Sequence, residues 1–122
     1  MAKILVVDDS PTQLTNLVKI VQGQGHDVVT ATNGMEGIEK ARQEQPDLIL
    51  MDVVMPELNG FQATRQLTKG ADTAHIPIII VTTKDQETDR VWGKRQGAKD
   101  YLTKPVHEDV LLKTVDRQLA DQ

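Results

Sequence analysis

The segment Asp47–Asp52 constrains the fold most, because it is a short apolar run with an acidic residue at each end. A run this short and apolar is typical of a strand that is buried on both faces, in a parallel sheet covered by helices. Asp52 then lies at the carboxyl end of the strand, which is the edge where open α/β sheets bind ligands. Taken alone, Asp52 fits a turn residue as well as it fits a functional group.

Similar short runs recur along the chain and alternate with helical segments. The other runs are Ile4–Val7, Val28–Ala31 and Pro77–Val81, and Asp100–Leu102 is expected to be a short fifth strand. Helices are expected from Pro11 to the glycines at 23 and 25, between Asn33 and Pro46, from Asn59 to about Leu67, from Lys84 to Gln96 and from Val110 to Leu119. This alternation with short connections predicts an α/β fold with a doubly wound parallel sheet.

Apolar residues at helical spacing predict which side of each helix is buried. The expected inner residues are Leu14, Leu17, Val18 and Val21 in the first helix, Met35, Ile38 and Ala41 in the second, Phe61, Ala63 and Leu67 in the third, and Leu112, Val115 and Leu119 in the last. The fourth helix has only Val91 and Trp92 as large apolar residues, so much of it should face water. Trp92 therefore either anchors a partner protein, as exposed Trp often does, or folds back on the core.

Composition excludes several classes of protein. The 122 residues fit a single domain, and the net charge of −4 with 2% aromatic residues argues against nucleic acid as the main partner. The absence of Cys excludes disulfides and thiolate chemistry. No apolar run approaches the ~20 residues that span a bilayer. We therefore expect a soluble, cytoplasmic, monomeric protein without membrane insertion.

Charged and hydroxyl side chains follow the predicted strands at one edge of the sheet. They are Asp8 and Asp9 after the first strand, Asp52 after the third, Thr82 after the fourth and Lys104 just past the fifth. Three carboxylates at one place repel one another unless a cation lies between them. Oxygen ligands of this kind suit Mg²⁺. The sequence therefore predicts a magnesium site with a lysine and a hydroxyl beside it.

This combination meets the electrostatic requirement of phosphoryl transfer, which depends on positioning and charge neutralisation more than on acid–base catalysis. Asp52 is the candidate nucleophile, because a carboxylate can carry a phosphoryl group. Lys104 would supply a positive charge to that group and Thr82 a hydrogen-bond donor.

The sequence resembles the response-regulator receiver domain over its whole length. The resemblance lies in I-L-V-V-D-D-S at 4–10, L-I-L-M-D-V-V-M-P-E-L-N-G at 48–60, P-I-I-I-V-T-T at 77–83 and G-A-K-D-Y-L-T-K-P at 97–105. It implies a flavodoxin-like fold with five helices and strand order 2-1-3-4-5, and phosphoryl acceptance from a histidine kinase. We expect a single receiver domain without an output domain, which would act through protein contacts or as a phosphate sink.

The resemblance also implies a role for each site residue. Asp52 would be the phosphoacceptor, and Asp9 and Asp52 would touch Mg²⁺ directly, with Asp8 acting through water and the Val54 carbonyl as a further ligand. Lys104 would contact the phosphoryl group, and its bond to Pro105 would be cis. Thr82 and Tyr101 would be the switch residues, with Tyr101 turning inward once Thr82 has bound the phosphoryl group.

Two segments outside this pocket carry a narrower resemblance. F-Q-A-T-R-Q-L-T-K at 61–69 and V-T-T-K-D-Q-E-T-D-R-V-W-G-K-R-Q-G-A at 81–98 are similar to stand-alone regulators of the type IV pilus chemosensory system, which acts in twitching motility. Because these residues are not needed for phosphoryl chemistry, they indicate a subgroup. The implied partners are a chemosensory histidine kinase and a downstream protein, such as the pilus motor apparatus.

Two other functions remain open. A Mg²⁺-dependent phosphohydrolase with an aspartyl nucleophile would need a second acid two residues beyond Asp52, where Val54 stands. A phosphorylation-independent interaction module would have no use for the complete set of acids, hydroxyl and lysine. In receiver domains the positions of Val54 and Lys84 border the path of the hydrolytic water. An apolar Val54 cannot orient that water, so the resemblance implies a long-lived phosphoryl group.

Overall fold

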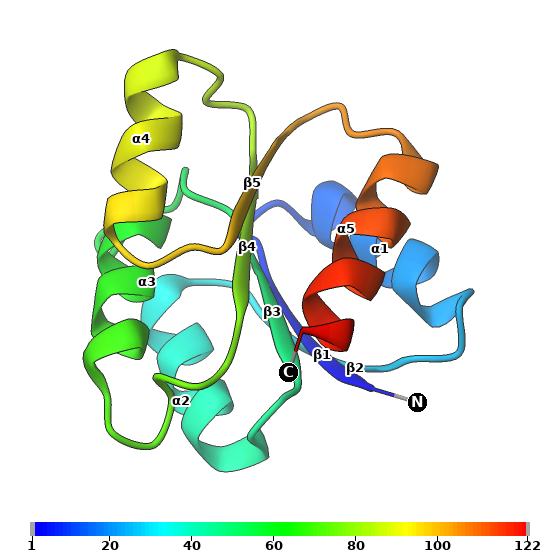
Figure 1. Cartoon of the computed structure of the whole chain (residues 1–122), viewed down its shortest axis with the longest axis horizontal. Coiled ribbons are helices and arrows are strands. Elements are labelled where there is room, and N and C mark those ends of the chain that lie inside the picture. Colours follow the sequence, from blue (N-terminus) through cyan, green and yellow to red (C-terminus); the bar gives the residue numbers. More distant parts are fainter. Residues whose placement is uncertain (1, 122) are drawn as a thin grey trace.

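Parallel strands form one sheet between two layers of helices (Figure 1). The computed structural model of the protein describes residues 2–121. The strands are β1 (Lys3–Val7), β2 (Asp27–Ala31), β3 (Leu48–Met51), β4 (Ile78–Thr82) and β5 (Asp100–Thr103). The helices are α1 (Pro11–Gln22), α2 (Gly34–Glu44), α3 (Gly60–Lys69), α4 (Glu87–Arg95) and α5 (Glu108–Ala120). The strand order β2-β1-β3-β4-β5 confirms the predicted flavodoxin-like α/β fold.

Each face of the sheet has its own apolar core. Helices α1 and α5 cover one face, and α2, α3 and α4 cover the other (Figure 1). Along β1, Ile4 and Val6 pack toward α1 and α5, whereas Leu5 and Val7 pack toward α2 and α3. Side chains alternate between the two faces of a strand, so a strand with helices on both faces has to be apolar throughout. This explains the uninterrupted apolar runs in β1, β3 and β4.

The register of the sheet sets where the polar residues emerge. Val7 pairs with Met51, so the residues that follow β1 and β3 leave the sheet side by side. Thr82 pairs with Thr103 at the end of β4 and β5, which brings the residue after β5 to the same edge. The acidic residues, Thr82 and Lys104 are therefore neighbours in space as a consequence of strand pairing.

Side-chain caps begin the two helices that follow the acidic strand ends. The hydroxyl of Ser10 accepts a hydrogen bond from the amide of Gln13 at 3.4 Å at the start of α1. Before α3, the side chain of Asn59 accepts from the amide of Gln62, and the Gln62 side chain accepts in return from the amide of Asn59, both at 2.9 Å. This capping box fixes where the loop from Asp52 ends.

The expected inner face of α2 is wrong at one residue. Met35 is 56% exposed, whereas Ile38 and Ala41 are buried as predicted. The reason is tertiary: Leu58, from the loop between β3 and α3, packs on that end of the core beside Gly34. Because Leu58 already covers the space there, Met35 is left at the surface.

Two helix assignments at the carboxyl end of the chain also need correction. Helix α4 begins at Glu87 rather than at Lys84, because the amide of Gln86 donates to the Asp89 carboxylate at 3.3 Å and starts the helix there. Helix α5 begins at Glu108, with Glu108 and Asp109 in its first turn ahead of Val110, and it buries Leu111 where Leu112 was expected. Val115 is buried and Leu119 packs on the core, as predicted. None of the described helices is long and apolar enough to cross a membrane.

Candidate functional site

The carboxyl edge of the sheet brings together the residues that the sequence singles out there. Asp8 and Asp9 follow β1, Asp52 follows β3, Thr82 ends β4 and Lys104 follows β5. Asp8 and Thr82 are completely buried and Asp52 is 7% exposed, whereas Asp9 faces solvent. Carboxylate and hydroxyl side chains are rarely buried so deeply. This burial marks the carboxyl edge of the sheet as a candidate functional site.

The three carboxylates are close enough to share a cation. One oxygen from each of Asp8, Asp9 and Asp52 lies within 4.8 Å of the other two. One oxygen of Asp8 accepts a hydrogen bond from the Ser10 amide at 2.9 Å, and one oxygen of Asp52 accepts from the Val53 amide at 2.8 Å. Backbone amides therefore orient two of the acids and leave oxygens facing one another.

Lys104 provides the positive charge beside these acids. Its ammonium lies 2.6 Å from an oxygen of Asp8 and 3.8 Å from an oxygen of Asp52, and its side chain is 6% exposed. The Lys104 amide donates to the Thr82 carbonyl at 2.8 Å, and the peptide bond to Pro105 is cis, as expected. One lysine neutralises one of three acids, so the site retains excess negative charge.

Burial raises the pKa of Asp52 above its ordinary value, and this effect exceeds the lowering by Lys104 and by the nearby Thr82 hydroxyl. The negative charge of Asp8 raises the pKa of Asp52 further. A divalent cation held by Asp8, Asp9 and Asp52 would relieve both effects. The site also fits the preference of Mg²⁺ for a few carboxylates and several waters. Val54 lies at the same opening, with its amide 3.4 Å from Asp52, and its carbonyl is a further candidate ligand.

We predict that Mg²⁺ stabilises the protein through these carboxylates. At a free Mg²⁺ concentration one hundred times the Kd, the free energy of unfolding should rise by about 2.7 kcal/mol. Urea unfolding with Mg²⁺ and with a chelator measures this difference. The gain should be lost in Asp9→Asn and kept in Asp27→Asn, a control at the opposite edge of the sheet. An equal gain in both variants would contradict the assignment.

Gly60 allows α3 to approach Asp52 closely, a role that the sequence did not show. A Cβ at position 60 would lie 2.7 Å from the Val53 Cα and would clash with the Asp52 carbonyl. The Gly60 amide donates to the Val53 carbonyl at 3.0 Å. The first turn of α3 therefore supports the backbone of Asp52 directly, and only glycine leaves room for it.

Thr82 and Tyr101, the two expected switch residues, lie next to the site and differ in their hydrogen bonding. The Thr82 hydroxyl is close enough to Asp52 to lower its pKa, but it makes no hydrogen bond of ordinary geometry with any described residue. The Thr82 hydroxyl is therefore a buried donor that is free to bind a group on Asp52. The Tyr101 ring is 4% exposed and its hydroxyl donates to the Lys84 carbonyl at 2.8 Å. The ring therefore occupies the inner position in this structure, and a turn of Tyr101 on phosphorylation stays a prediction.

Arg90 and Gly93 hold Tyr101 in this position, and sequence reasoning missed both. The Arg90 guanidinium donates to the Tyr101 carbonyl at 3.3 Å and to the Thr103 hydroxyl at 2.6 Å, and lies 5.3 Å from the centre of the ring. Gly93 lets α4 sit directly on the ring, since a Cβ there would lie 2.9 Å from Tyr101 Cδ2. Arg90 therefore ties α4 to β5 across the switch tyrosine.

Replacing Arg90 by Met should loosen this attachment. The loss of one cation–π contact and two charged hydrogen bonds should reduce the free energy of unfolding by about 1–3 kcal/mol. Arg95→Met, on the exposed part of the same helix, is the matched control and should have little effect. Urea unfolding of the two variants compares them directly. Equal and small changes would show that Arg90 does not hold α4.

Trp92 does not fold back into the core. Its side chain is 50% exposed, and it lines an opening together with Phe61 of α3 and with Asp9. This excludes the buried alternative and leaves the interaction role as a proposal.

Comparison with known proteins identifies the class of the chain. Residues 4–116 match the family described as response regulator receiver domain. The chain belongs to this family. It is 66% identical to PilH of Pseudomonas aeruginosa strain PAO1 over 120 residues, covering 98% of this chain and 99% of that protein. It is 45% identical to the alkaline phosphatase synthesis transcriptional regulatory protein PhoP of Bacillus subtilis, covering 84% of this chain but only 42% of PhoP.

Solved structures agree with this assignment. The chemotaxis response regulator CheY4 of Vibrio cholerae is 35% identical with a TM-score of 0.89, covering 97% of this chain and 98% of that one. The receiver domain of a sensor histidine kinase from Pseudomonas aeruginosa PAO1 is 29% identical with a TM-score of 0.90, covering 98% of each chain. That structure has a magnesium ion coordinated in its active-site cleft. The similarity therefore extends to receiver domains of regulators and of kinases.

Proposed function

We propose that the protein is a phosphorylation switch in which Asp52 accepts a phosphoryl group from the phosphohistidine of a kinase. The observation that carries this proposal is the position of Asp52, with Asp8 and Lys104 beside it and with the unpaired Thr82 hydroxyl facing it. A carboxylate that only caps a turn would need none of these neighbours. Family membership supports the same reading.

In the transfer step, a carboxylate oxygen of Asp52 attacks phosphorus and the bond from phosphorus to the histidine nitrogen breaks. The Val53 amide orients the Asp52 carboxylate, and the Lys104 ammonium offsets the negative charge of the phosphoryl oxygens. Mg²⁺ held by the acids would supply further charge neutralisation. The product carries about −1.5 to −2 charges at pH 7 where Asp52 carried one.

The added charge would then act through Thr82 and α4. The buried Thr82 hydroxyl would donate to a phosphoryl oxygen, which gives this donor the partner that it lacks. Movement of Thr82 would change the end of β4, whose neighbour Lys84 accepts the hydrogen bond of Tyr101. The contacts of Tyr101 and Arg90 would pass the change to α4, as in a two-state element biased by a local charge.

We predict a phosphoryl group that persists for minutes rather than seconds. Val54 is 50% exposed at the opening and has no polar atom on its side chain to orient an attacking water. Replacing Val54 by Asn should shorten the lifetime, whereas Met35→Asn, at an exposed position on α2, should leave it unchanged. Intact-mass measurements after removal of the donor follow the decay. Loss of the group from the wild-type protein within seconds would contradict the prediction.

We further propose a role in twitching motility, with a chemosensory histidine kinase as donor in the cytoplasm and a protein target such as the pilus motor apparatus. The support is 66% identity to PilH over nearly the whole length of both chains. A role as phosphate sink, in which the group is drained from the kinase without a target, is the second reading of the same similarity.

The test of the proposed function is labelling by a small acyl phosphate with Mg²⁺. The proposal predicts stoichiometric gain of one phosphoryl group, abolished by a chelator and without turnover of a phosphoester. Steady hydrolysis of a phosphoester would favour the phosphohydrolase, and failure to label would favour the phosphorylation-independent module.

A further inference from the structure

An apolar groove lies beside the candidate site, between the loop after β3 and the helix α4. It has a volume of about 660 Å³, and its lining includes Asp9, Val54, Phe61, Lys84 and Trp92. The largest exposed apolar surfaces on it belong to Trp92 and Val54, each half exposed. An exposed Trp beside a groove is unusual in a protein with 2% aromatic residues, and it is the kind of residue that dominates binding interfaces.

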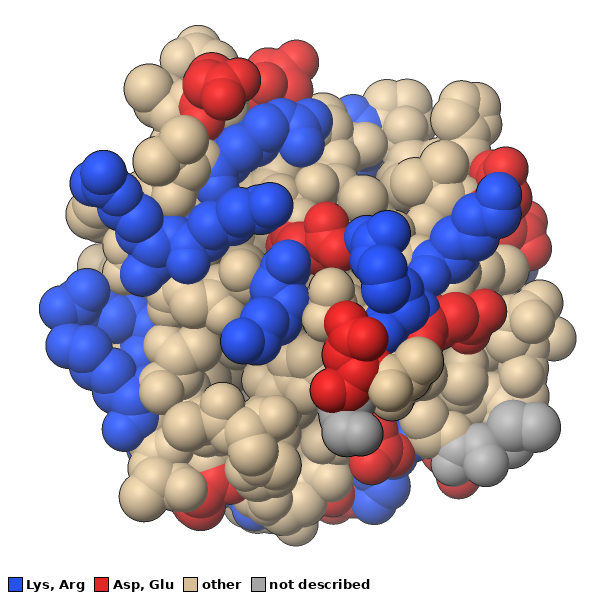
Figure 2. Space-filling view, in the orientation of Figure 1, with Lys and Arg blue, Asp and Glu red and all other residues tan. Residues whose placement is uncertain are grey.

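Positive charge continues from this groove along α3 and α4. Helix α3 contains no Asp or Glu and carries Arg65 and Lys69, both exposed. Helix α4 has its acids in the first turn and Lys94 and Arg95 in the last. Figure 2 shows Lys and Arg gathered on the side of the molecule where α3 and α4 lie. None of these four cations forms an ion pair with a residue in the described part of the chain.

We propose that the groove and these four cations form a docking surface, the α3–α4 surface, for a short acidic segment of a partner protein with a large apolar side chain. The apolar side chain would lie against Trp92 and Phe61, and the acids would lie on Arg65 and Arg95. Arg65 donates to the Gln96 side chain at 3.4 Å, so the cations border the seam between the two helices. Helix dipoles explain Lys and Arg in a last turn, but they explain neither the exposed Trp nor the complete lack of acids on α3.

The charge of the protein indicates which kind of partner fits the α3–α4 surface. The protein has a net charge of −4, so a long polyanion or an anionic membrane would meet repulsion beyond the four cations. A short acidic segment would contact only the positively charged surface. The apolar groove also gives an anchor that neither a nucleic acid backbone nor a lipid headgroup would use.

Binding at this surface would be coupled to the chemistry at Asp52, an extension that rests on the proposed function. Asp9 and Val54 line the groove and also lie beside Asp52. An occupant would therefore cover the route of water to a phosphorylated Asp52 and extend its lifetime. By linkage, the phosphorylated form would bind the same occupant with a different affinity from that of the unmodified form.

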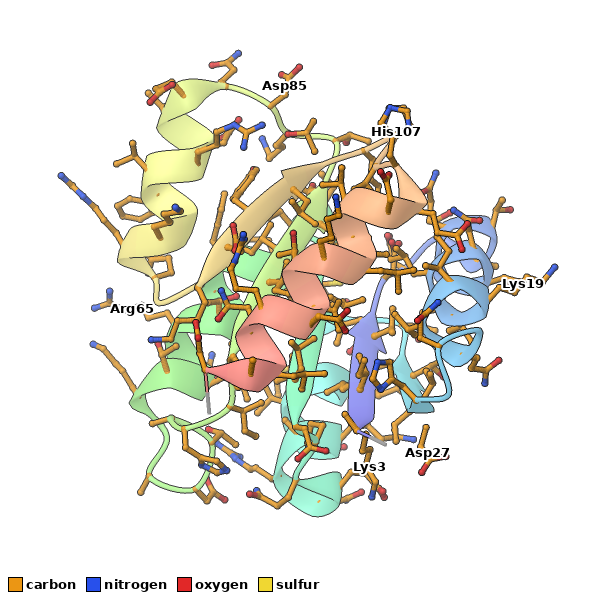
Figure 3. The ribbon with its side chains drawn as sticks, turned by 45° about the vertical axis from the view of Figure 1, so that its right-hand side comes forward. Lys3, Lys19, Asp27, Arg65, Asp85 and His107 are labelled. Atoms are coloured by element: carbon orange, nitrogen blue, oxygen red, sulfur yellow. The ribbon has the colours of Figure 1, made fainter. Side chains whose placement is uncertain are left out.

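Trp92 reports occupancy directly, because it is the single Trp in the chain. The probes are capped peptides of equal length: glutamates around a leucine pair, lysines around the same pair, and glutamates around a glycine pair. We expect a saturable change in Trp92 emission with the first peptide alone, weakened by salt. The combined variant Arg65→Glu with Arg95→Glu should weaken binding roughly tenfold. Lys19→Glu, on the far side of the molecule (Figure 3), should leave binding unchanged.

Three results would overturn the proposal: no saturable change with the glutamate–leucine peptide, equal binding of all three peptides, or unchanged affinity in the charge-reversal variant. Circular dichroism of each variant shows that it is folded. The fluorescence titration is run on unphosphorylated protein and on Asp52→Asn, so it succeeds or fails independently of phosphoryl acceptance. The coupling is then read from the decay of the phosphorylated protein with and without the first peptide.

Discussion

Replacing Asp52 by Asn should abolish phosphoryl acceptance completely. The amide side chain has the shape of the carboxylate, but it has no charged oxygen to attack phosphorus. Intact-mass measurement after incubation with an acyl phosphate and Mg²⁺ should show no added group on Asp52→Asn. Asp27→Asn, with the same change on an exposed residue of β2 at the other edge of the sheet (Figure 3), should label like the wild type. Stoichiometric labelling of Asp52→Asn would reject Asp52 as the acceptor.

The same substitution should increase stability at neutral pH when Mg²⁺ is absent. Because burial raises the pKa of Asp52, the folded state binds its proton more tightly than the unfolded state does. The charged carboxylate therefore destabilises the fold at pH 7, and this penalty disappears as pH falls through the raised pKa. Asp52→Asn should be more stable than the wild type at pH 7, with a difference that shrinks on acidification. A less stable variant at pH 7 would contradict this account of the site.

Replacing Lys104 by Met should have the largest effect on stability. The substitution keeps an unbranched side chain of nearly the same length but leaves the fully buried Asp8 carboxylate without its ion-pair partner at 2.6 Å. Removal of one partner of a buried pair costs about 3–5 kcal/mol. Urea unfolding measures this loss, and Lys19→Met provides an exposed control. Added Mg²⁺ should recover part of the loss, since it neutralises the same acids.

A loss below about 1 kcal/mol, as for an exposed ion pair, would show that Lys104 does not stabilise the acids. The functional consequence is separable. Lys104→Met with Mg²⁺ should still be folded but should accept the phosphoryl group more slowly, because the phosphoryl oxygens lose a nearby positive charge.

The sheet and the position of the site could be predicted from the sequence for a simple reason. A strand with helices on both faces has to be apolar along its length, and the polar residue that ends such a run has to lie at the edge of the sheet. The position of Asp52 at the edge of the sheet follows directly from this pattern. The approach of Asp8, Asp52 and Lys104 then follows from parallel pairing, because parallel strands all end at the same edge.

Other features depend on contacts between elements and could not be read from local patterns. Met35 has helical spacing with Ile38, but it is exposed because Leu58 covers that end of the core. Arg90 looks like any charged residue on a polar helix, and only the packing of α4 on β5 brings it to Tyr101. Gly60 gives no sign in the sequence that its missing side chain makes room for Asp52.

The conformation and exposure of a side chain also could not be predicted from the sequence. The resemblance to receiver domains implies that Tyr101 is a switch residue, but the sequence does not say whether its ring lies inside or outside. Its burial here depends on Gly93 and on the hydrogen bond to Lys84. The exposure of Trp92 is a similar case, because a helix with so few apolar residues could have turned it either way.

The most direct test of the central claim is to map the phosphorylated residue after transfer from a phosphorylated histidine kinase. The protein is incubated with the phosphokinase and Mg²⁺, digested, and analysed by mass spectrometry, with hydroxylamine treatment to identify acyl phosphates. The account predicts a single hydroxylamine-sensitive phosphoryl group on Asp52. This group should not form when Mg²⁺ is chelated before the transfer. Label on a hydroxyl or histidine side chain, or no label at all, would contradict it.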